Sequence, residues 1–335
     1  MACDAVAYLS NFENHYRAVA RLATGRALWG NSPAVLQHVR NPLAVSQAFK
    51  RRGFAAPVVV SREPGTLEPG TLEPGTSWLV KPVSSGGGRR VRRWRAGTRV
   101  PRGCYLQKFV EGVSGSVVFA AAGGRAVPLG ISRQLIGETA FGAAGYQYCG
   151  SILVPDGDTD EDMTDASIFA EACALSRAAA DEFRLVGVNG IDFIAHAGRA
   201  HVVEVNPRWS ASMELVEYAY GVSVFGAHAA ACANGVLPAF DLAAARRGAH
   251  TVGKAIVFAR RDVVVGDTSE WLSLPAHPAL PALRDIPHPG ERIAAGHPVC
   301  TVMAIGTDHA TCQAALARLA DQVYGRLSSW KREVA

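Results

Sequence analysis

Several features that would assign the chain to a well-known protein class are missing from its sequence. No apolar run among its 335 residues approaches the roughly 20 residues that a membrane-spanning helix needs. The first residues also lack a basic segment followed by an apolar core, the pattern of a secretory signal. Its seven cysteines include no Cys-x-x-Cys pair, which favours free thiols over disulfides or a zinc site. These absences predict a protein of the cytoplasm with no membrane contact.

Common catalytic signatures are absent as well. The sequence has no Gly-x-x-x-x-Gly-Lys-[Ser/Thr] loop, no Gly-x-Gly-x-x-Gly fingerprint and no Ser-His-Asp or Cys-His arrangement. A net charge of +5 suits anionic small molecules, but it is too small on its own to indicate nucleic acid. Five arginines around Trp94 in residues 89–95 leave nucleic-acid binding open. We favour a solvated strand of a small lid, and we predict no nucleic-acid partner.

The chain does contain one stretch on which metal-capable oxygen atoms gather. Two segments within residues 187–208 alternate apolar and polar side chains around a short turn, the pattern of a β-hairpin. Glu204 and Asn206 share one face, because alternate residues of a strand point to the same side. Val203 and Val205 are expected to point the other way, into a core.

Asp192 lies on the first strand of this hairpin, where its orientation depends on the turn. A two-residue loop would pair Asp192 with Val203 and place it on the wrong face, so we predict a three-residue loop at 197–199 or a bulge. Asp192, Glu204 and Asn206 would then converge, and such oxygen donors suit a hard cation, Mg²⁺ or Mn²⁺. A surface hairpin with solvated side chains is the alternative. The Asn-Pro step that ends the second strand at the polar cluster argues against it.

A second candidate site follows the strand expected at residues 78–82. Lys81 lies near the end of that strand, and Ser84, Ser85 and Gly86 begin a run of small residues. Small residues let backbone N–H groups approach and surround an anion, while Lys81 supplies a positive charge. A glycine turn in a hairpin is the alternative, and the residues by themselves leave both interpretations open.

Together these segments resemble the ATP-grasp enzymes over roughly residues 41–240. The pairing of Gly190-Ile191-Asp192-Phe193 with Glu204-Val205-Asn206-Pro207-Arg208 is similar to the metal-binding motif of that family, and the Lys81 loop is similar to its phosphate-covering loop. The resemblance implies an α/β chain with the mixed ATP-grasp fold, which uses ATP and Mg²⁺ (or Mn²⁺).

The resemblance also implies a division into domains. We expect a short N-terminal α/β unit at 1–40, a two-part ATP-grasp core at 41–240 with a lid at about 78–110, and a small C-terminal β-rich domain at 241–335. Residues 63–76 repeat Glu-Pro-Gly-Thr-Leu, from which no core can be built. We interpret this repeat as an extended surface loop that arose by a tolerated tandem expansion.

Residues 105–112 resemble the hinge between lid and core in this family. The resemblance implies that Gln107 and Lys108 lie at the base of the nucleotide and that the backbone of Val110 binds it. Ser114 stands near the position of a ribose-contacting acid, which is a departure from the family pattern.

Three further positions take their interpretation from the resemblance. Arg133 and Arg208 are the implied catalytic residues: Arg133 reaches the transferring phosphate, and Arg208 clamps the acyl phosphate or a substrate carboxylate with its planar fork. Asn41-Pro42 stands where many members have Asp-Lys. The lysine that would contact the α-phosphate is therefore missing or supplied from elsewhere.

The implied reaction transfers a phosphoryl group from ATP to a carboxylate, and an amine then attacks the acyl phosphate to form an amide. Residues 111–117 together with Ser132-Arg133-Gln134 look most like the tyramine–glutamate ligase branch of methanofuran-type cofactor synthesis, which implies glutamate as a substrate. Other amino-acid ligases, a carboxylase-like enzyme and a non-catalytic nucleotide-binding protein are the alternatives. The expected partners are a small-molecule carboxylate and an amine. The oligomeric state stays open, with a homodimer among the options.

Overall fold

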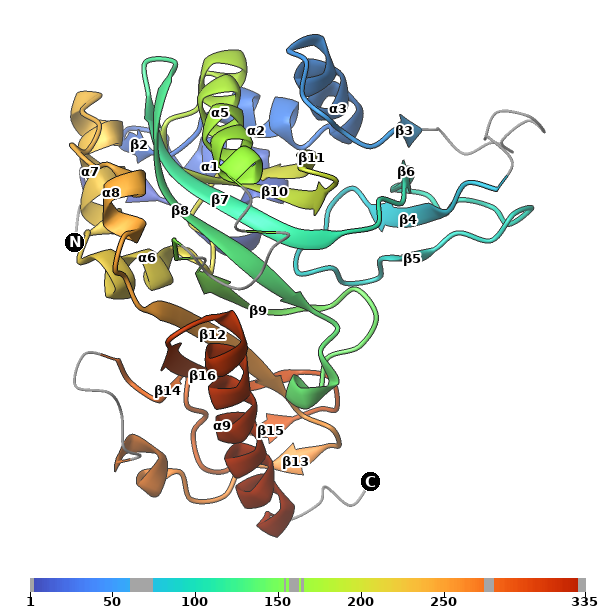
Figure 1. Cartoon of the computed structure of the whole chain (residues 1–335), viewed down its shortest axis with the longest axis vertical. Coiled ribbons are helices and arrows are strands. Elements are labelled where there is room, and N and C mark those ends of the chain that lie inside the picture. Colours follow the sequence, from blue (N-terminus) through green and yellow to red (C-terminus); the bar gives the residue numbers. More distant parts are fainter. Residues whose placement is uncertain are drawn as a thin grey trace.

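The computed structural model describes residues 3–60, 75–153, 155–156, 163, 166–273 and 280–330, so the 63–76 repeat lies almost wholly outside the described residues. Its centre is an eight-stranded antiparallel sheet (Figure 1). Across this sheet the strands follow the order β11 (Arg199–Asn206), β10 (Gly187–His196), β7 (Val113–Ala122), β8 (Arg125–Ile136), β9 (Tyr148–Leu153), β12 (Thr251–Phe258), β16 (Pro298–Gly306) and β14 (Leu283–Arg284). This mixed α/β architecture is the expected fold class.

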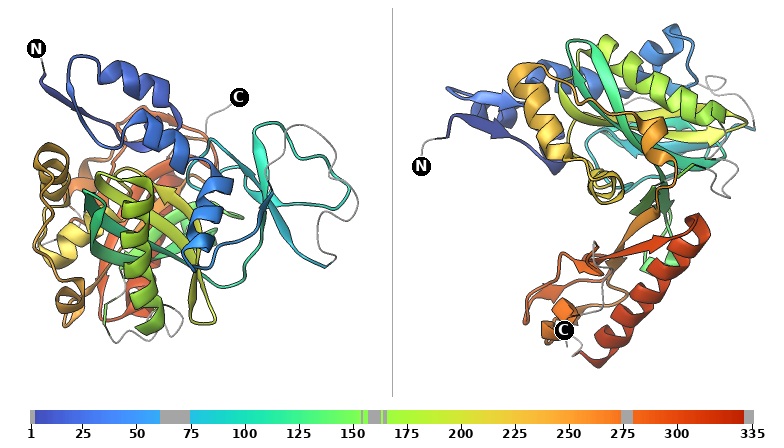
Figure 2. Two further views of the ribbon diagram at one scale, coloured as in Figure 1. Left: turned by 90° about the horizontal axis from the view of Figure 1, so that it is seen from above. Right: turned by 60° about the vertical axis from the view of Figure 1, so that its left-hand side comes forward.

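A second, four-stranded antiparallel sheet forms a lid that stands out from the main body (Figure 2). Its strands in spatial order are β3 (Val59–Val60), β6 (Cys104–Lys108), β4 (Trp78–Pro82) and β5 (Arg92–Arg93). Trp78, Val80 and Leu106 pack together on one face. Lys81 and Gln107 alternate with them and face a cavity on the other side. Both residues of β5 are exposed, as expected for a solvated basic strand.

The N-terminal unit joins a parallel pair of short strands to two helices. The strands β1 (Ala5–Ala7) and β2 (Ala27–Trp29) flank η1 (Ser10–Asn14) and α1 (Tyr16–Leu22), and α2 (Pro33–Val39) follows. The Ser32 side chain caps α2. Asn41 caps α3 (Pro42–Arg51) by accepting hydrogen bonds from two backbone N–H groups, and Pro42 takes the first turn. At this site Asn41 and Pro42 therefore start a helix.

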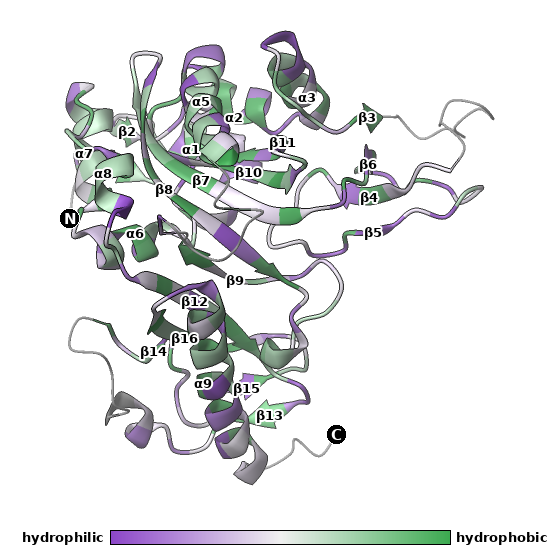
Figure 3. Ribbon diagram, viewed as in Figure 1, coloured by the Kyte–Doolittle hydropathy of each residue, from purple (hydrophilic) through white to green (hydrophobic). Residues whose placement is uncertain are grey.

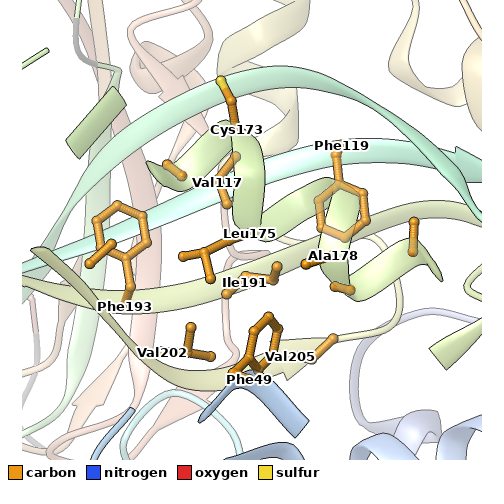
Figure 4. Close-up of a cluster of buried hydrophobic side chains, with 14 of the residues drawn as sticks. Phe49, Val117, Phe119, Cys173, Leu175, Ala178, Ile191, Phe193, Val202 and Val205 are labelled. Carbon is orange, nitrogen blue, oxygen red and sulfur yellow. The ribbon is translucent and has the colours of Figure 1, made fainter. Parts of the chain in front are cut away.

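Helices cover both faces of the central sheet. On one face, α3 and α5 (Ala166–Phe183) pack over Val117 and Phe119 of β7, and Figure 4 shows Phe49 of α3 among these side chains. On the other face, α6 (Met213–Tyr220) and α7 (Val224–Asn234) pack over Val118 and Ala120. This alternation along β7 makes it a central strand that is buried on both sides. The short helix α8 (Leu242–Arg246) follows α7.

The C-terminal part forms a lobe of its own in Figure 2, but it shares the central sheet, because β12, β14 and β16 continue that sheet. The helix α9 (His309–Ser329) packs on β12 and β16, and a capping box between Asp308 and Thr311 fixes its start. Figure 3 shows mostly hydrophobic colouring on these strands and polar residues on the outer side of α9. The remaining elements are β13 (Val263–Val264), β15 (Arg292–Ile293), η2 (Thr139–Phe141) and η3 (Ser269–Ser273).

Within the part of the chain that the structure describes, no helix combines the length and apolar character that crossing a membrane requires. The lid sheet begins at Val59, ahead of the segment 78–110. The division of the chain at residues 40 and 240 stays a prediction.

Candidate functional site

The hairpin of β10 and β11 brings its polar residues together by means of a bulge. The turn between His196 and Arg199 has only two residues, and both take the positive φ of a tight hairpin turn. A regular ladder would therefore pair Asp192 with Val203. The register instead shifts after Asp192, which stands directly opposite Glu204. The predicted three-residue loop does not occur, and the alternative prediction, a bulge, is confirmed.

The bulge also decides the orientation of the valines. Val205 is buried in the core beneath α5, as expected. The prediction for Val203 is wrong, because Val203 is the extra residue of the bulge and lines the cavity. Two consecutive residues, Val203 and Glu204, thus face the same side. A bulge has this effect, since it inserts one residue without changing the rest of the ladder.

A cavity of about 500 Å³ lies between the lid sheet, the glycine loop after β4 and the face of the central sheet that carries Asp192. The glycine loop reaches the central sheet, where Tyr148 N donates to Gly87 O at 3.0 Å. Gly88 has a positive φ, and a Cβ on it would overlap the carbonyl group of Tyr146. The run of glycines therefore lets the loop lie directly against the sheet and close one wall of the cavity.

Eleven of the thirteen residues predicted from the sequence line this single cavity. They come from the lid, the hinge and the central hairpin: Lys81, Ser85, Gly86, Gln107, Lys108, Val110, Ser114, Asp192, Glu204, Asn206 and Arg208. Segments more than 100 residues apart in the chain therefore form one site.

Two predicted residues do not line the cavity. Ser84 is exposed at the start of the glycine loop. Arg133 lies on β8, where Gln134 and Ile136 face the cavity and alternation turns Arg133 to the opposite side. The structure thus contradicts the expected placement of Arg133. Gln134 occupies the corresponding cavity position and hydrogen-bonds to Asp192.

The pKa values of the two facing carboxyl groups are shifted in opposite directions. Burial, and next the charge of Glu204, raise the pKa of Asp192 to about 7. Burial alone would also raise the pKa of Glu204, but the nearby charges of Lys81 and Arg40 hold it below its usual value. Lys81 itself donates to Gln107 Oε1 at 3.1 Å. Of the two, Glu204 therefore favours its charged form, and Asp192 holds its proton more tightly than an exposed carboxyl group does.

The donor set at this point fits a hard cation. Two cross-strand carboxylates repel each other when both are charged, and a divalent ion removes that repulsion. The Asn206 amide lies beside them, with Nδ2 donating to Asp192 Oδ2 at 2.9 Å. No group of three His, Cys, Asp or Glu side chains suited to a metal ion occurs among the described residues. The available ligands are therefore two carboxylates and one amide oxygen.

Sequence reasoning missed the contacts that hold Arg208. Its Nη2 donates to Glu13 Oε1 at 3.0 Å, and its Nε lies 2.7 Å from Glu13 Oε2. Glu13 is only 2% exposed and belongs to η1 of the N-terminal unit. The same unit binds the residue before Arg208, since Tyr8 Oη and Asn31 Nδ2 both donate to Pro207 O. No sequence pattern could have revealed this, because some 195 residues separate Glu13 from Arg208.

Sequence reasoning also missed Arg40, which lines the cavity immediately after α2. Its side chain is 13% exposed, and its Nη1 lies 3.7 Å from Glu204 Oε2. Its position directly before Asn41-Pro42, where a cation is expected and none occurs, is a signal that could have identified it.

A family model described as an ATP-grasp domain matches residues 39–212, just over half of the chain. This range contains most of the cavity. No curated protein sequence matches the chain.

Solved structures with the same fold include three enzymes. N5-carboxyaminoimidazole ribonucleotide synthetase from Thermus thermophilus has a TM-score of 0.68 at 19% identity, over 100% of this chain and 84% of that one. L-amino acid ligase from Bacillus licheniformis has a TM-score of 0.65 at 15% identity, over 90% and 75%. Pyruvate carboxylase from Rhizobium etli has a TM-score of 0.67 at 13% identity over 95% of this chain, which spans only 28% of that larger enzyme. At these identities the likeness concerns the fold alone.

Proposed function

Because the chain belongs to the ATP-grasp domain family, we propose that it is an ATP-dependent ligase that forms a carbon–nitrogen bond through an acyl phosphate. The observation that carries this proposal is the shared cavity, in which the Asp192–Glu204 pair, Lys81 and Arg208 face one another. Phosphoryl transfer depends mainly on positioning and on neutralisation of charge, and these side chains supply both.

Each element that lines the cavity is proposed to bind a different part of ATP and its metal ion. The lid and hinge, with Gln107, Lys108 and the backbone of Val110, hold the base of ATP, and Ser114 lies toward its sugar. Lys81 and the backbone of the glycine loop bind the phosphates. Asp192, Glu204 and Asn206 hold Mg²⁺ or Mn²⁺, which when bound neutralises phosphate charge.

Arg208 is proposed to orient the substrate carboxylate for attack on the γ-phosphate of ATP. Its Nη2 donates to Glu13 Oε1 at 3.0 Å, and its Nη1 donates to the carbonyl of Trp209 at 2.9 Å. Glu13 occupies the Nε–Nη2 edge of this planar group, so the Nη1–Nη2 edge is the one that would donate two parallel hydrogen bonds to a carboxylate or an acyl phosphate, in exchange for its 3.4 Å contact with Asn206 Oδ1. Transfer of the γ-phosphate to the carboxylate releases ADP and forms an acyl phosphate. The amine then attacks the carbonyl carbon of the acyl phosphate and displaces phosphate, which gives the amide.

For the substrates we propose glutamate and an aromatic amine such as tyramine, in methanofuran-type cofactor synthesis. Support comes from the likeness of residues 111–117 and Ser132-Arg133-Gln134 to that branch, and from Ser114, Ser116 and Gln134, which line the cavity. Another amino-acid ligase or a carboxylase-like enzyme is the second candidate, since solved structures of both kinds share the fold. We further propose a cytoplasmic location, and a homodimer as the assembly to test.

The test is release of ADP and phosphate from ATP and Mg²⁺ with glutamate, with and without a panel of amines that includes tyramine and tyrosine. Release that requires one carboxylate and one amine supports the ligase and identifies its substrates. ATP binding without release under any pairing leaves two interpretations, a substrate outside the panel or a non-catalytic nucleotide-binding protein, and nucleotide binding by Glu204→Gln is then the measurement that separates them. The Glu204→Gln variant is measured beside the wild type in every assay, and we expect it to lose metal-dependent release.

A further inference from the structure

Arg40 occupies the junction between the glycine loop and the carboxylate pair. Its Nη2 donates to two carbonyl groups of the loop region, Val83 O at 3.1 Å and Ser85 O at 3.3 Å. Its Nε donates to Asn14 Oδ1 at 3.0 Å. Its Nη1 lies 3.7 Å from Glu204 Oε2. One guanidinium group thus contacts the loop, the N-terminal unit and Glu204 together.

Neither of the two residues that follow Arg40 supplies a positive charge to this part of the cavity. Pro42 lines the same cavity but carries no charge, and Asn41 is engaged in capping α3. Arg40 precedes this cap directly and points into the cavity, where its side chain is 13% exposed. A guanidinium can donate five hydrogen bonds and stays charged at any relevant pH, so it suits repeated exchange between carbonyl, carboxylate and phosphate oxygens.

The Arg40 guanidinium, 3.7 Å from Glu204 Oε2, opposes the approach of a second cation to the same carboxylate oxygen. Two positive charges at such short range repel strongly in a partly buried site. Phosphate oxygens in the cavity would attract Arg40 away from Glu204, because a charged hydrogen bond to phosphate is among the strongest that a guanidinium makes. Occupation of the phosphate site and release of Glu204 are therefore linked.

On the basis of the proposed nucleotide site, we propose that Arg40 supplies the cation missing at Pro42 and couples nucleotide binding to metal binding. Arg40 neutralises Glu204 while it holds the glycine loop, and it moves to phosphate when nucleotide enters. Glu204 then becomes available to the metal. The coupling is reciprocal, so metal and nucleotide each strengthen the binding of the other.

This mechanism predicts opposite effects on two affinities. Replacing Arg40 by glutamine removes a charged hydrogen bond to phosphate and weakens Mn²⁺–ADP binding about tenfold. The same change removes the competing cation at Glu204, so Mn²⁺ alone binds severalfold more tightly. Mere damage to the fold would weaken both, and a residue that only binds phosphate would leave the affinity for Mn²⁺ alone unchanged.

The experiment uses the full chain as wild type, Arg40→Gln, Arg40→Lys and Arg51→Gln. Calorimetry measures ADP binding in the presence of Mn²⁺, and electron paramagnetic resonance measures binding of Mn²⁺ without nucleotide. Arg51 is the matched control, because it lies exposed on α3, pairs with Glu182 and carries the same charge. We expect wild-type values for Arg51→Gln and an intermediate loss of ADP affinity for Arg40→Lys, which keeps the charge but loses the fork.

Three results overturn the proposal. Unchanged ADP affinity in Arg40→Gln removes the phosphate role of Arg40, and unchanged or weaker binding of Mn²⁺ alone removes the coupling. Either result leaves the proposed nucleotide site intact, provided that the wild type binds Mn²⁺–ADP. A wild type with no measurable ADP affinity refutes the proposed function itself, and the role of Arg40 falls with it.

Discussion

The ion pair between Glu13 and Arg208 offers the most direct test of how the N-terminal unit contributes to the site. Glu13 is 2% exposed, and the side chain of Arg208 is 16% exposed. Two contacts join them, Nε to Oε2 at 2.7 Å and Nη2 to Oε1 at 3.0 Å. Replacing Glu13 by glutamine keeps the shape of the side chain but removes its charge and turns one acceptor into a donor.

The expected cost follows from this geometry. Removing one partner of a buried ion pair typically destabilises a protein by about 3–5 kcal/mol. Arg208 retains an acceptor in Trp209 O at 2.9 Å, so its charge is not left without a hydrogen bond. We therefore expect the lower end, about 3 kcal/mol, in the free energy of unfolding. Because Arg208 also loses its orientation, we expect the kcat/KM for the carboxylate substrate to fall on the order of 10²-fold.

Urea unfolding and steady-state ADP release measure the two effects on the same preparations. Glu182→Gln is the matched control, because Glu182 binds Arg51 at 2.9 Å and Arg52 at 2.8 Å on the surface. Exposed pairs of this kind contribute up to about 1 kcal/mol, and we expect no change in kinetics. If Glu13→Gln were as stable and as active as the control, Glu13 would not position Arg208, and the reasoning would be refuted.

Three further predictions concern the hairpin and the core. Glu204→Gln should lower metal-dependent ADP release by about 10²-fold or more while thermal unfolding by circular dichroism stays cooperative, and unchanged activity would contradict the assignment of the hairpin. The pKa of Asp192 is raised to about 7, and a carboxyl group must lose its proton to bind a metal, so the affinity for Mn²⁺ should rise as the pH increases through 7. Asp192→Asn should remove this pH dependence. A flat wild-type profile would argue against Asp192 as a ligand. Phe49→Ala should lower the free energy of unfolding, measured in urea, by about 3–5 kcal/mol, because Phe49 is 1% exposed in the core beneath α5. A decrease under about 1 kcal/mol would mean that neighbouring core side chains fill the space left by the ring.

Local patterns in the sequence were sufficient where the chemistry depends on spacing along one strand or loop. Alternation places Glu204 and Asn206 beside each other whatever surrounds them. The small residues after Lys81 permit a close approach of backbone that larger residues would prevent, as the packing of Gly88 against Tyr146 illustrates. The starts of α2 at Pro33 and of α3 at Pro42 likewise depend on neighbouring residues, because the side chains of Ser32 and Asn41 cap them.

The sequence determined which chemical groups the site contains, because residue type and short-range spacing are written in the chain. Only the tertiary structure decided which of them meet. The bulge at Val203 places Glu204 opposite Asp192, and the register of β8 turns Gln134 into the cavity and Arg133 away from it. Contacts such as Glu13 with Arg208 depend on how separate elements pack, and no local pattern encodes the distance between residues so far apart in the chain.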